Sequence, residues 1–250
     1  MINKKIAILT GDVHHKLSNN YWDKNEFECM KEEIEIIKKE KIKATFFITG
    51  KLLNEKQKEF LQLKEIKDIE FGGHTYSAFQ PNLLRLFFKF ILNSEYGPRF
   101  WQKNDIQKTK TEFERSGLKM NCWRTHSYKS NNNTLDLLFK QNVKIISDKH
   151  SIGIFDLTKN KFGILDLCIT MPKDEVIEPN LEKNIEWINN YIKLLNESVK
   201  KKEMIVMALH PNRMKMLDNF ETFKKIIKLL KKNNYQFFKV SDILNLRDIP

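Results

Sequence analysis

Short runs of apolar residues alternate with longer stretches of helical periodicity along almost the whole chain. Ile6–Thr10, Ala44–Ile48 and Met204–Leu209 are typical of buried strands, because they are continuously apolar and bounded by polar residues. Asn25–Lys41 and Leu181–Lys201 place apolar residues at helical spacing on a charged background. This alternation predicts an α/β protein, either a parallel barrel or a doubly wound sheet.

The length and composition favour one compact domain that spans residues 1–250. A chain of 250 residues with 41% hydrophobic content can bury a full core without disulfides or metals. Residues 80–119 are the least regular part, with helix-type stretches and no strand, and are expected to form a helical insertion over one face of the core. Within it, Leu83–Leu92 is interrupted by Arg85 and Lys89, and a short, mostly buried helix is favoured over membrane or partner docking.

Cytoplasmic localisation is expected, because the N-terminus lacks the pattern of a secretory signal and no stretch is long and apolar enough for a membrane span. The three cysteines are widely separated, which favours reduced thiols. The net charge of +12 favours acidic partners. However, no nucleic-acid-binding motif accompanies it, so no nucleic acid is expected. Peripheral membrane association and the oligomeric state are left open.

Polar groups suited to metal binding follow the predicted strands closely. Asp12, His14 and His15 come after the first strand, His74 after the third, and His210 directly after Met204–Leu209. His126 lies just past another strand-like piece near Trp123. A single histidine is more often a core or capping residue, but loops after parallel strands converge on one face. Imidazoles and carboxylates that converge there predict a site for zinc or a similar divalent cation.

Five segments resemble the motifs of polysaccharide deacetylases, the NodB-homology family. They are Leu9-Thr-Gly-Asp12-Val-His14, Lys43-Ala-Thr-Phe-Phe-Ile-Thr-Gly50, Phe71-Gly-Gly-His74-Thr-Tyr-Ser77, Trp123-Arg124-Thr-His-Ser-Tyr128 and Ala208-Leu-His210-Pro211. Their order and rough spacing agree with the family over nearly the whole chain. The resemblance implies a distorted (β/α)7-type barrel and metal-assisted removal of an acyl group from an N-acetylated sugar.

The resemblance also implies roles for individual residues. Asp12 corresponds to the general base, Arg124 to the arginine that holds this carboxylate, and His210 to the general acid. His74 corresponds to the first histidine of the metal-binding His-x3-His motif. Asp148, which follows the strand-like Val143–Ser147, is the carboxylate expected to orient the region of His210. The implied cofactor is a divalent metal, with zinc as the first expectation.

The chain departs from the family pattern at two positions. Val13 replaces the metal-binding aspartate that usually follows the base, and some branches of the family place that ligand two positions after the base, which is His14 here. Ala78 replaces the second histidine of His-x3-His and cannot bind a metal. Either His15 or His126 is a candidate for the missing ligand. The predicted ligand set is therefore His14, His74 and His126, with His15 as the alternative.

Three functions fit these residues. The favoured one is a metal-dependent deacetylase that acts on an amino sugar in a cytosolic or lipid-linked glycan precursor. The second, motivated by Ala78, is a non-catalytic glycan-binding relative that has lost its metal. The third is another barrel hydrolase such as an amidohydrolase. It ranks lowest, because those enzymes usually begin with His-x-His and here His14 and His15 are adjacent.

Overall fold

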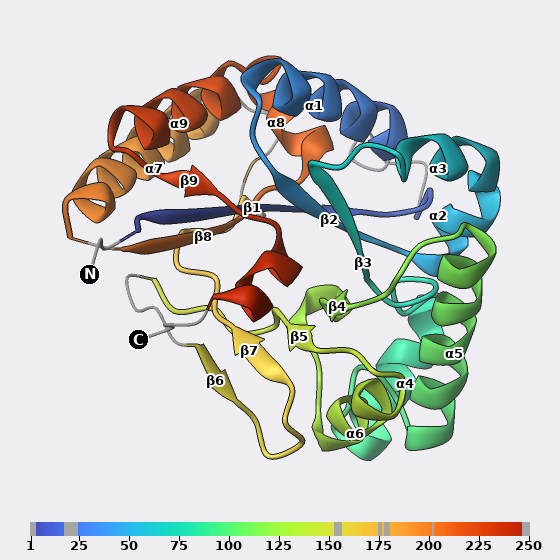
Figure 1. Cartoon of the computed structure of the whole chain (residues 1–250). Coiled ribbons are helices and arrows are strands. Elements are labelled where there is room, and N and C mark those ends of the chain that lie inside the picture. Colours follow the sequence, from blue (N-terminus) through green and yellow to red (C-terminus); the bar gives the residue numbers. More distant parts are fainter. Residues whose placement is uncertain are drawn as a thin grey trace.

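The computed structural model describes residues 4–17, 25–152, 157–174, 177, 181–201 and 203–246. Figure 1 shows a curled sheet with helices around its outer face. The strands follow the order β6-β7-β5-β4-β3-β2-β1-β8, and β9 pairs with β1. All pairings are parallel except the antiparallel β6–β7 pair. The predicted α/β barrel of the NodB type is therefore confirmed.

The strands are long on one side of the sheet and short on the other. The strand bounds are β1 Ile6–Val13, β2 Ala44–Ile48, β3 Ile69–Gly73, β4 Cys122–Trp123, β5 Ile145–Ile146, β6 Leu157–Lys159, β7 Leu165–Leu167, β8 Met204–Ala208 and β9 Gln236–Phe237. Every residue of β1, β2 and β8 is buried, and this includes Thr10, Asp12 and Thr45 as well as the apolar residues that predicted these strands. Strand β1 extends three residues beyond the predicted Thr10, so Asp12 lies within the strand.

The helices follow the strands in sequence. Their bounds are α1 Glu26–Glu40, α2 Gly50–Glu55, α3 Gln57–Leu63, α4 Asn82–Leu92, α5 Arg99–Arg115, α6 Asn132–Lys140, α7 Leu181–Lys201, α8 Pro211–Asp218 and α9 Glu221–Lys232. Two 3₁₀ helices, η2 (His126–Tyr128) and η3 (Val240–Asn245), complete the described elements. None of the helices in the described ranges is long and apolar enough to cross a membrane.

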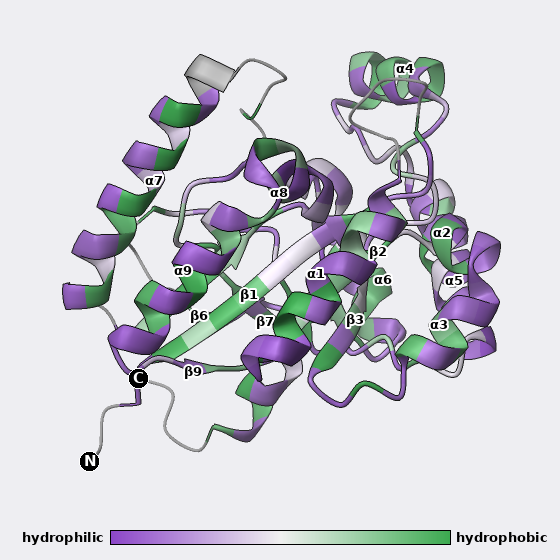
Figure 2. Ribbon diagram, turned by 90° about the horizontal axis from the view of Figure 1, so that it is seen from above, coloured by the Kyte–Doolittle hydropathy of each residue, from purple (hydrophilic) through white to green (hydrophobic). Residues whose placement is uncertain are grey.

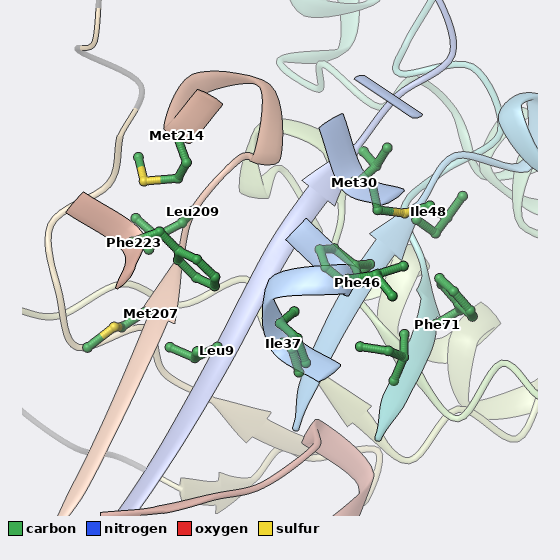
Figure 3. Close-up of a cluster of buried hydrophobic side chains, with 14 of the residues drawn as sticks. Leu9, Met30, Ile37, Phe46, Ile48, Phe71, Met207, Leu209, Met214 and Phe223 are labelled. Carbon is green, nitrogen blue, oxygen red and sulfur yellow. The ribbon is translucent and has the colours of Figure 1, made fainter. Parts of the chain in front are cut away.

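Both faces of the sheet are covered by apolar side chains, because alternate strand residues point to opposite faces. Leu9 and Phe46 belong to the larger cluster, which packs against helices such as α1 and α9. Figure 3 shows part of this cluster. Ile8 and Phe47 belong to a smaller cluster on the inner face, where Val240 of η3 closes the curled sheet.

Glycine allows β3 and β4 to approach each other beside the site. A Cβ atom on Gly73 would lie 2.4 Å from a ring carbon of Trp123, which is far inside van der Waals contact. Gly73 pairs with Trp123 in the sheet, and both residues directly precede predicted site residues, His74 and Arg124. The close packing therefore brings the ends of these two strands together.

The predicted insertion at residues 80–119 consists of α4 and α5, and one expectation about it was wrong. Helix α5 packs between α2 and α6, but none of the residues of α4 is buried within the described structure. Its exposed apolar residues are Leu83, Leu84, Leu86, Phe87, Phe90, Ile91 and Leu92. The physical reason is that α4 is held by the contact of Phe88 with Trp101 and by the pairing of Arg85 and Lys89 with Glu95, and these contacts leave its apolar side uncovered.

Candidate active site

A polar cavity of about 290 Å³ lies at the carboxyl ends of the parallel strands. It contains residues from four strand ends: Asp12 and His14 at β1, His74 after β3, His126 after β4, and His210 after β8. The remaining lining residues are Leu17, Glu26, Ser127, Tyr128, Asn212 and Arg213. The fold thus gathers side chains that are up to about 200 positions apart in the sequence, as expected for loops that follow parallel strands.

Three histidines meet in this cavity. The Nε2 atom of His14 lies 3.1 Å from Nε2 of His74 and 3.2 Å from Nδ1 of His126. One nitrogen of each ring lies within 4.8 Å of those of the other two. Zinc–nitrogen bonds of about 2.0–2.1 Å at a tetrahedral angle hold ligand nitrogens roughly 3.3 Å apart. The spacing of His14 to its two neighbours therefore suits a divalent cation.

The hydrogen bonds on the far side of two rings fix which nitrogen carries the proton. Nδ1 of His14 lies 3.1 Å from a Glu26 carboxylate oxygen, and Nδ1 of His74 lies 2.8 Å from the Arg124 carbonyl oxygen. Since both oxygens accept hydrogen bonds, both Nδ1 atoms are donors, and in the neutral form of each ring Nε2 then presents a lone pair. Two lone pairs 3.1 Å apart repel each other unless an electrophile lies between them. This arrangement fits a metal cation.

Burial keeps two of the three rings neutral. It lowers the pKa of His74 to about 3, despite the opposing charge of Asp12. Burial, followed by the neighbouring His14 and His74, also holds the pKa of His126 well below its usual value. Neutral imidazole is the form that binds metals. His74 and His126 are therefore in the form that binds a metal at neutral pH.

Asp12 is held by Arg124, as the resemblance implies. Nη1 of Arg124 donates to Oδ1 of Asp12 over 2.7 Å, and both side chains are buried. Burial alone would raise the pKa of Asp12, but the charge of Arg124, followed by those of His74 and His210, lowers it well below the usual value. Asp12 is thus an ionised carboxylate in the cavity.

His210 is held by Asp174, a residue that was not singled out from the sequence. Nδ1 of His210 lies 2.7 Å from Oδ1 of Asp174, and the second Asp174 oxygen accepts from the His210 backbone N–H. Burial opposes protonation of His210, but the charge and hydrogen bond of Asp174 outweigh it and raise the pKa of the imidazole. His210 is therefore suited to donate a proton.

The structure gives Asp148 a different position from the expected one. Its Oδ1 accepts a hydrogen bond from the backbone N–H of Thr125, 2.7 Å away, so it supports the segment between Arg124 and His126. The carboxylate that orients His210 is Asp174, and the assignment of Asp148 to that task is corrected. Asp174 lies in a segment without a strand or helix, where the sequence has no periodic signal.

The structure also separates the two candidates for the missing ligand. His126 joins His14 and His74, whereas the Nδ1 atom of His15 lies 3.3 Å from Oγ1 of Thr49. Ala78, at the position of the absent histidine, is buried with a left-handed backbone. The next residue, Phe79, places its ring 5.3 Å from that of His126. The Phe79 ring thus packs against His126, the candidate ligand that follows β4 and not β3.

Glu26 is a further site residue that sequence reasoning missed. It begins α1, is buried, and accepts hydrogen bonds from both the backbone N–H and the ring of His14. An acidic residue in the first turn of a helix is common, because it interacts favourably with the helix dipole. Because Glu26 already has this common role at a helix start, the sequence did not indicate its contact with His14.

The profile of the family described as polysaccharide deacetylase matches residues 15–146, which is more than half of the chain. The chain belongs to the polysaccharide deacetylase family. No curated protein matches it by sequence. The match begins after Asp12 and His14 and ends before Asp174 and His210. Among the site residues it covers His74, Arg124 and His126, and the other four rest on their geometry in the structure.

Solved structures support the fold of this deacetylase-family member. A putative polysaccharide deacetylase from Mycobacterium smegmatis aligns with a TM-score of 0.74 and 13% identity, over 97% of this chain and 90% of the other. A structure titled Puue allantoinase aligns with a TM-score of 0.71 and 11% identity, over 98% and 90%. A CE4 family pseudoenzyme from Bacillus anthracis aligns with a TM-score of 0.59 and 18% identity. This alignment covers 97% of the chain but only 66% of the pseudoenzyme.

Proposed function

We propose that the protein is a metal-dependent hydrolase that removes an N-acyl group, such as acetyl, from an amino sugar. The observation that carries this proposal is the group of His14, His74 and His126, whose lone pairs face each other beside an ionised Asp12. His210 lines the same cavity with a raised pKa. A base, an acid and a ligand group in one cavity are what amide hydrolysis requires.

The three histidines would hold the cation, and Glu26 and the Arg124 carbonyl would fix two of their rings. A bound divalent cation supplies a Lewis acid that polarises the acyl carbonyl and lowers the pKa of water. Zinc is the proposed metal, because a set of neutral imidazoles suits it.

Asp12 and His210 would move the protons. Oδ1 of Asp12 is engaged by Arg124, so the second carboxylate oxygen would accept the proton of the attacking water. Nδ1 of His210 is engaged by Asp174, so Nε2 would donate a proton to the departing amine. Arg124 keeps Asp12 ionised, and Asp174 keeps His210 protonated, so each partner maintains the protonation state that its step needs.

The substrate proposed is an amino sugar within a cytosolic or lipid-linked glycan precursor. The family supports a carbohydrate substrate. The three cysteines Cys29, Cys122 and Cys168 are free, which favours the reducing cytoplasm as the place of action. A mass loss of one acyl group from an N-acetylated sugar nucleotide or lipid-linked sugar, in the presence of the protein, would identify the substrate.

A second candidate is a non-catalytic member of the family that binds glycans. Ala78 in place of a ligand favours it, and one of the similar structures is titled a pseudoenzyme. The retention of Asp12 with Arg124, and of His210 with Asp174, favours the hydrolase instead. A proton-accepting group and a proton-donating group, each with its own ion-pair partner in one cavity, are suited to proton transfer, which a protein that only binds does not require.

Metal content separates the two candidates. We expect about one zinc or similar ion per purified chain, lost in His74→Ala and in His126→Ala. His15→Ala is the matched control, since His15 is buried like His74 but lies outside the three-histidine group. Release of free amine from N-acetylated sugars should follow metal content across these variants. A wild-type chain without metal after reconstitution would support the glycan-binding candidate.

A further inference from the structure

Helix α4 exposes more apolar surface than any other helix in the described part of the chain. Phe90 is 91% exposed and Leu83 is 81% exposed, and Leu86, Phe87 and Ile91 are exposed beside them. At 100° per residue these side chains cover an arc of about 140° on one side of the helix. Figure 2 shows α4 standing out from the body of the molecule. Such a continuous apolar face on a protein surface marks an interaction site.

Contacts on the opposite side hold α4 in this orientation. Nε of Arg85 donates to Glu95 over 3.0 Å, and Nζ of Lys89 lies 3.4 Å from the same carboxylate. Phe88 packs its ring against Trp101 of α5, with centroids 5.6 Å apart. Arg85 and Lys89 therefore lie on the side of the helix opposite its apolar face, and Lys89 itself is still 58% exposed.

The helix lies beside the mouth of the active site. Glu95, which holds α4, also pairs with Lys129 at 3.6 Å, and Lys129 directly follows the 3₁₀ helix η2 that supplies His126. Phe79, just before α4, touches both His126 and Tyr96 with its ring. The apolar face and the catalytic cavity thus share one rim.

We propose that α4 is an interfacial helix that inserts its apolar face into an anionic membrane surface and so brings the catalytic cavity to that surface. Interfacial helices combine Phe and Leu on one face with nearby lysine and arginine, and they enter the boundary between head groups and acyl chains by about 5–10 Å. Helix α4 carries Arg85 and Lys89 and no acidic residue. This proposal does not depend on the proposed hydrolysis, since membrane binding is measured without turnover.

Charge favours an anionic bilayer over a neutral partner. The chain carries a net charge of +12, and three cations around Glu95 leave the base of α4 positive. Anionic lipids attract such a surface, and the attraction adds to burial of the apolar side chains.

Size argues against a second copy of the chain as the occupant. A stable protein–protein interface uses roughly 20–30 residues on each side. Helix α4 offers seven exposed apolar residues on one projecting element. This area is small for a dimer but sufficient for shallow insertion of a single helix into lipid.

The test is co-sedimentation of the full chain with vesicles of phosphatidylcholine plus phosphatidylglycerol, compared with phosphatidylcholine alone. We expect binding to the anionic vesicles and a loss of at least about tenfold in apparent partition for the double variant Leu83→Ser/Phe90→Ser. Leu61→Ser/Phe139→Ser is the matched control, since these residues are 40% and 55% exposed on other helices. The control should bind like the wild type.

Three results would overturn the proposal. The first is wild-type protein that stays in the supernatant with both vesicle types. The second is an α4 double variant that binds the anionic vesicles as well as the wild type does. A concentration-dependent dimer in light scattering that disappears in the α4 variant would assign this face to a second copy instead. Hydrolysis of a soluble N-acetylated sugar should be unchanged in the α4 variant, so loss of membrane binding is distinguishable from failure of the active site.

Discussion

The guanidinium of Arg124 lies 2.7 Å from the carboxylate of Asp12, and both groups are buried. The same guanidinium donates to the hydroxyl groups of Thr10 and Ser147 and to the Ser147 carbonyl, and it lies 4.3 Å from the centre of the Phe47 ring. Arg124 therefore connects the ends of three strands while it neutralises the proposed base. One residue serves both stability and catalysis, and the two contributions can be separated by mutation.

Arg124→Met should lower the free energy of unfolding by about 3–5 kcal/mol, because it leaves the Asp12 carboxylate buried without a partner. Urea denaturation measures this change. The double variant Asp12→Asn/Arg124→Met should recover part of the loss, since it leaves neither partner of this pair as an unpaired buried charge. Equal stability of the single and double variants would contradict the ion pair as the cause.

Asp12→Asn should reduce turnover by roughly 10²–10⁴-fold, because the amide cannot accept the proton of the attacking water. The three histidines keep their positions in this variant, so metal content should stay close to that of the wild type. Amine release and elemental analysis on the same preparation measure both quantities. Turnover at the wild-type rate would exclude Asp12 as the base.

The pH dependence of kcat/KM should show the partnership of His210 and Asp174. Asp12 stays ionised at acidic pH because Arg124 lowers its pKa, so it places no limit on activity near neutrality. His210 must be protonated to act as the acid, so activity should fall as the pH rises through its raised pKa. In Asp174→Asn the raising charge is gone, and this alkaline limb should move to lower pH. An unchanged limb would mean that another group donates the proton.

Much of the fold could be predicted from local pattern alone, whereas some contacts of the site could not. The continuous apolar runs of β1, β2 and β8 had only one reasonable interpretation, a set of buried parallel strands. Histidines directly after strands predicted a common location because topology brings strand ends together. Asp174 gave no such signal, since its approach to His210 depends on how an irregular segment crosses the site.

Helix α4 illustrates a second limit of sequence patterns. Its apolar residues were expected to be buried because such residues usually are. Burial, however, depends on which surfaces lie nearby, and no described element covers the apolar side of this helix. The pattern predicted a helix correctly but could not predict which of its sides would face the protein.

Glu26→Gln should weaken metal binding by about 10–100-fold while leaving the three ligands in place. The Glu26 carboxylate accepts the Nδ1 proton of His14, and it thereby orients the ring and increases the basicity of Nε2. An amide oxygen is a weaker acceptor, so the metal affinity should fall. Competition with a chromophoric chelator measures the affinity. Glu28→Gln, an exposed residue of the same helix, should have no effect.

Asp105 should make the free energy of unfolding depend on pH independently of any metal. Its Oδ2 accepts hydrogen bonds from the Tyr96 hydroxyl at 2.8 Å and the Tyr76 backbone N–H at 3.0 Å. It thereby fixes the loop that follows His74. Burial, only partly opposed by these hydrogen bonds, raises the pKa of the Asp105 carboxyl from 3.8 to about 6. The folded protein therefore binds this proton more tightly than the unfolded chain does.

Because the folded pKa is the higher one, the stability contributed by protonated Asp105 is fully present below about pH 4 and is lost as the pH rises to about 6. A difference of roughly two pKa units corresponds to about 3 kcal/mol. Asp105→Asn keeps an acceptor oxygen but cannot ionise, so it should lack this loss and be more stable than the wild type at pH 7 relative to pH 4. Urea denaturation of both proteins at the two pH values measures the difference. Parallel pH profiles for the two proteins would show that Asp105 ionises in the folded protein as readily as in the unfolded chain.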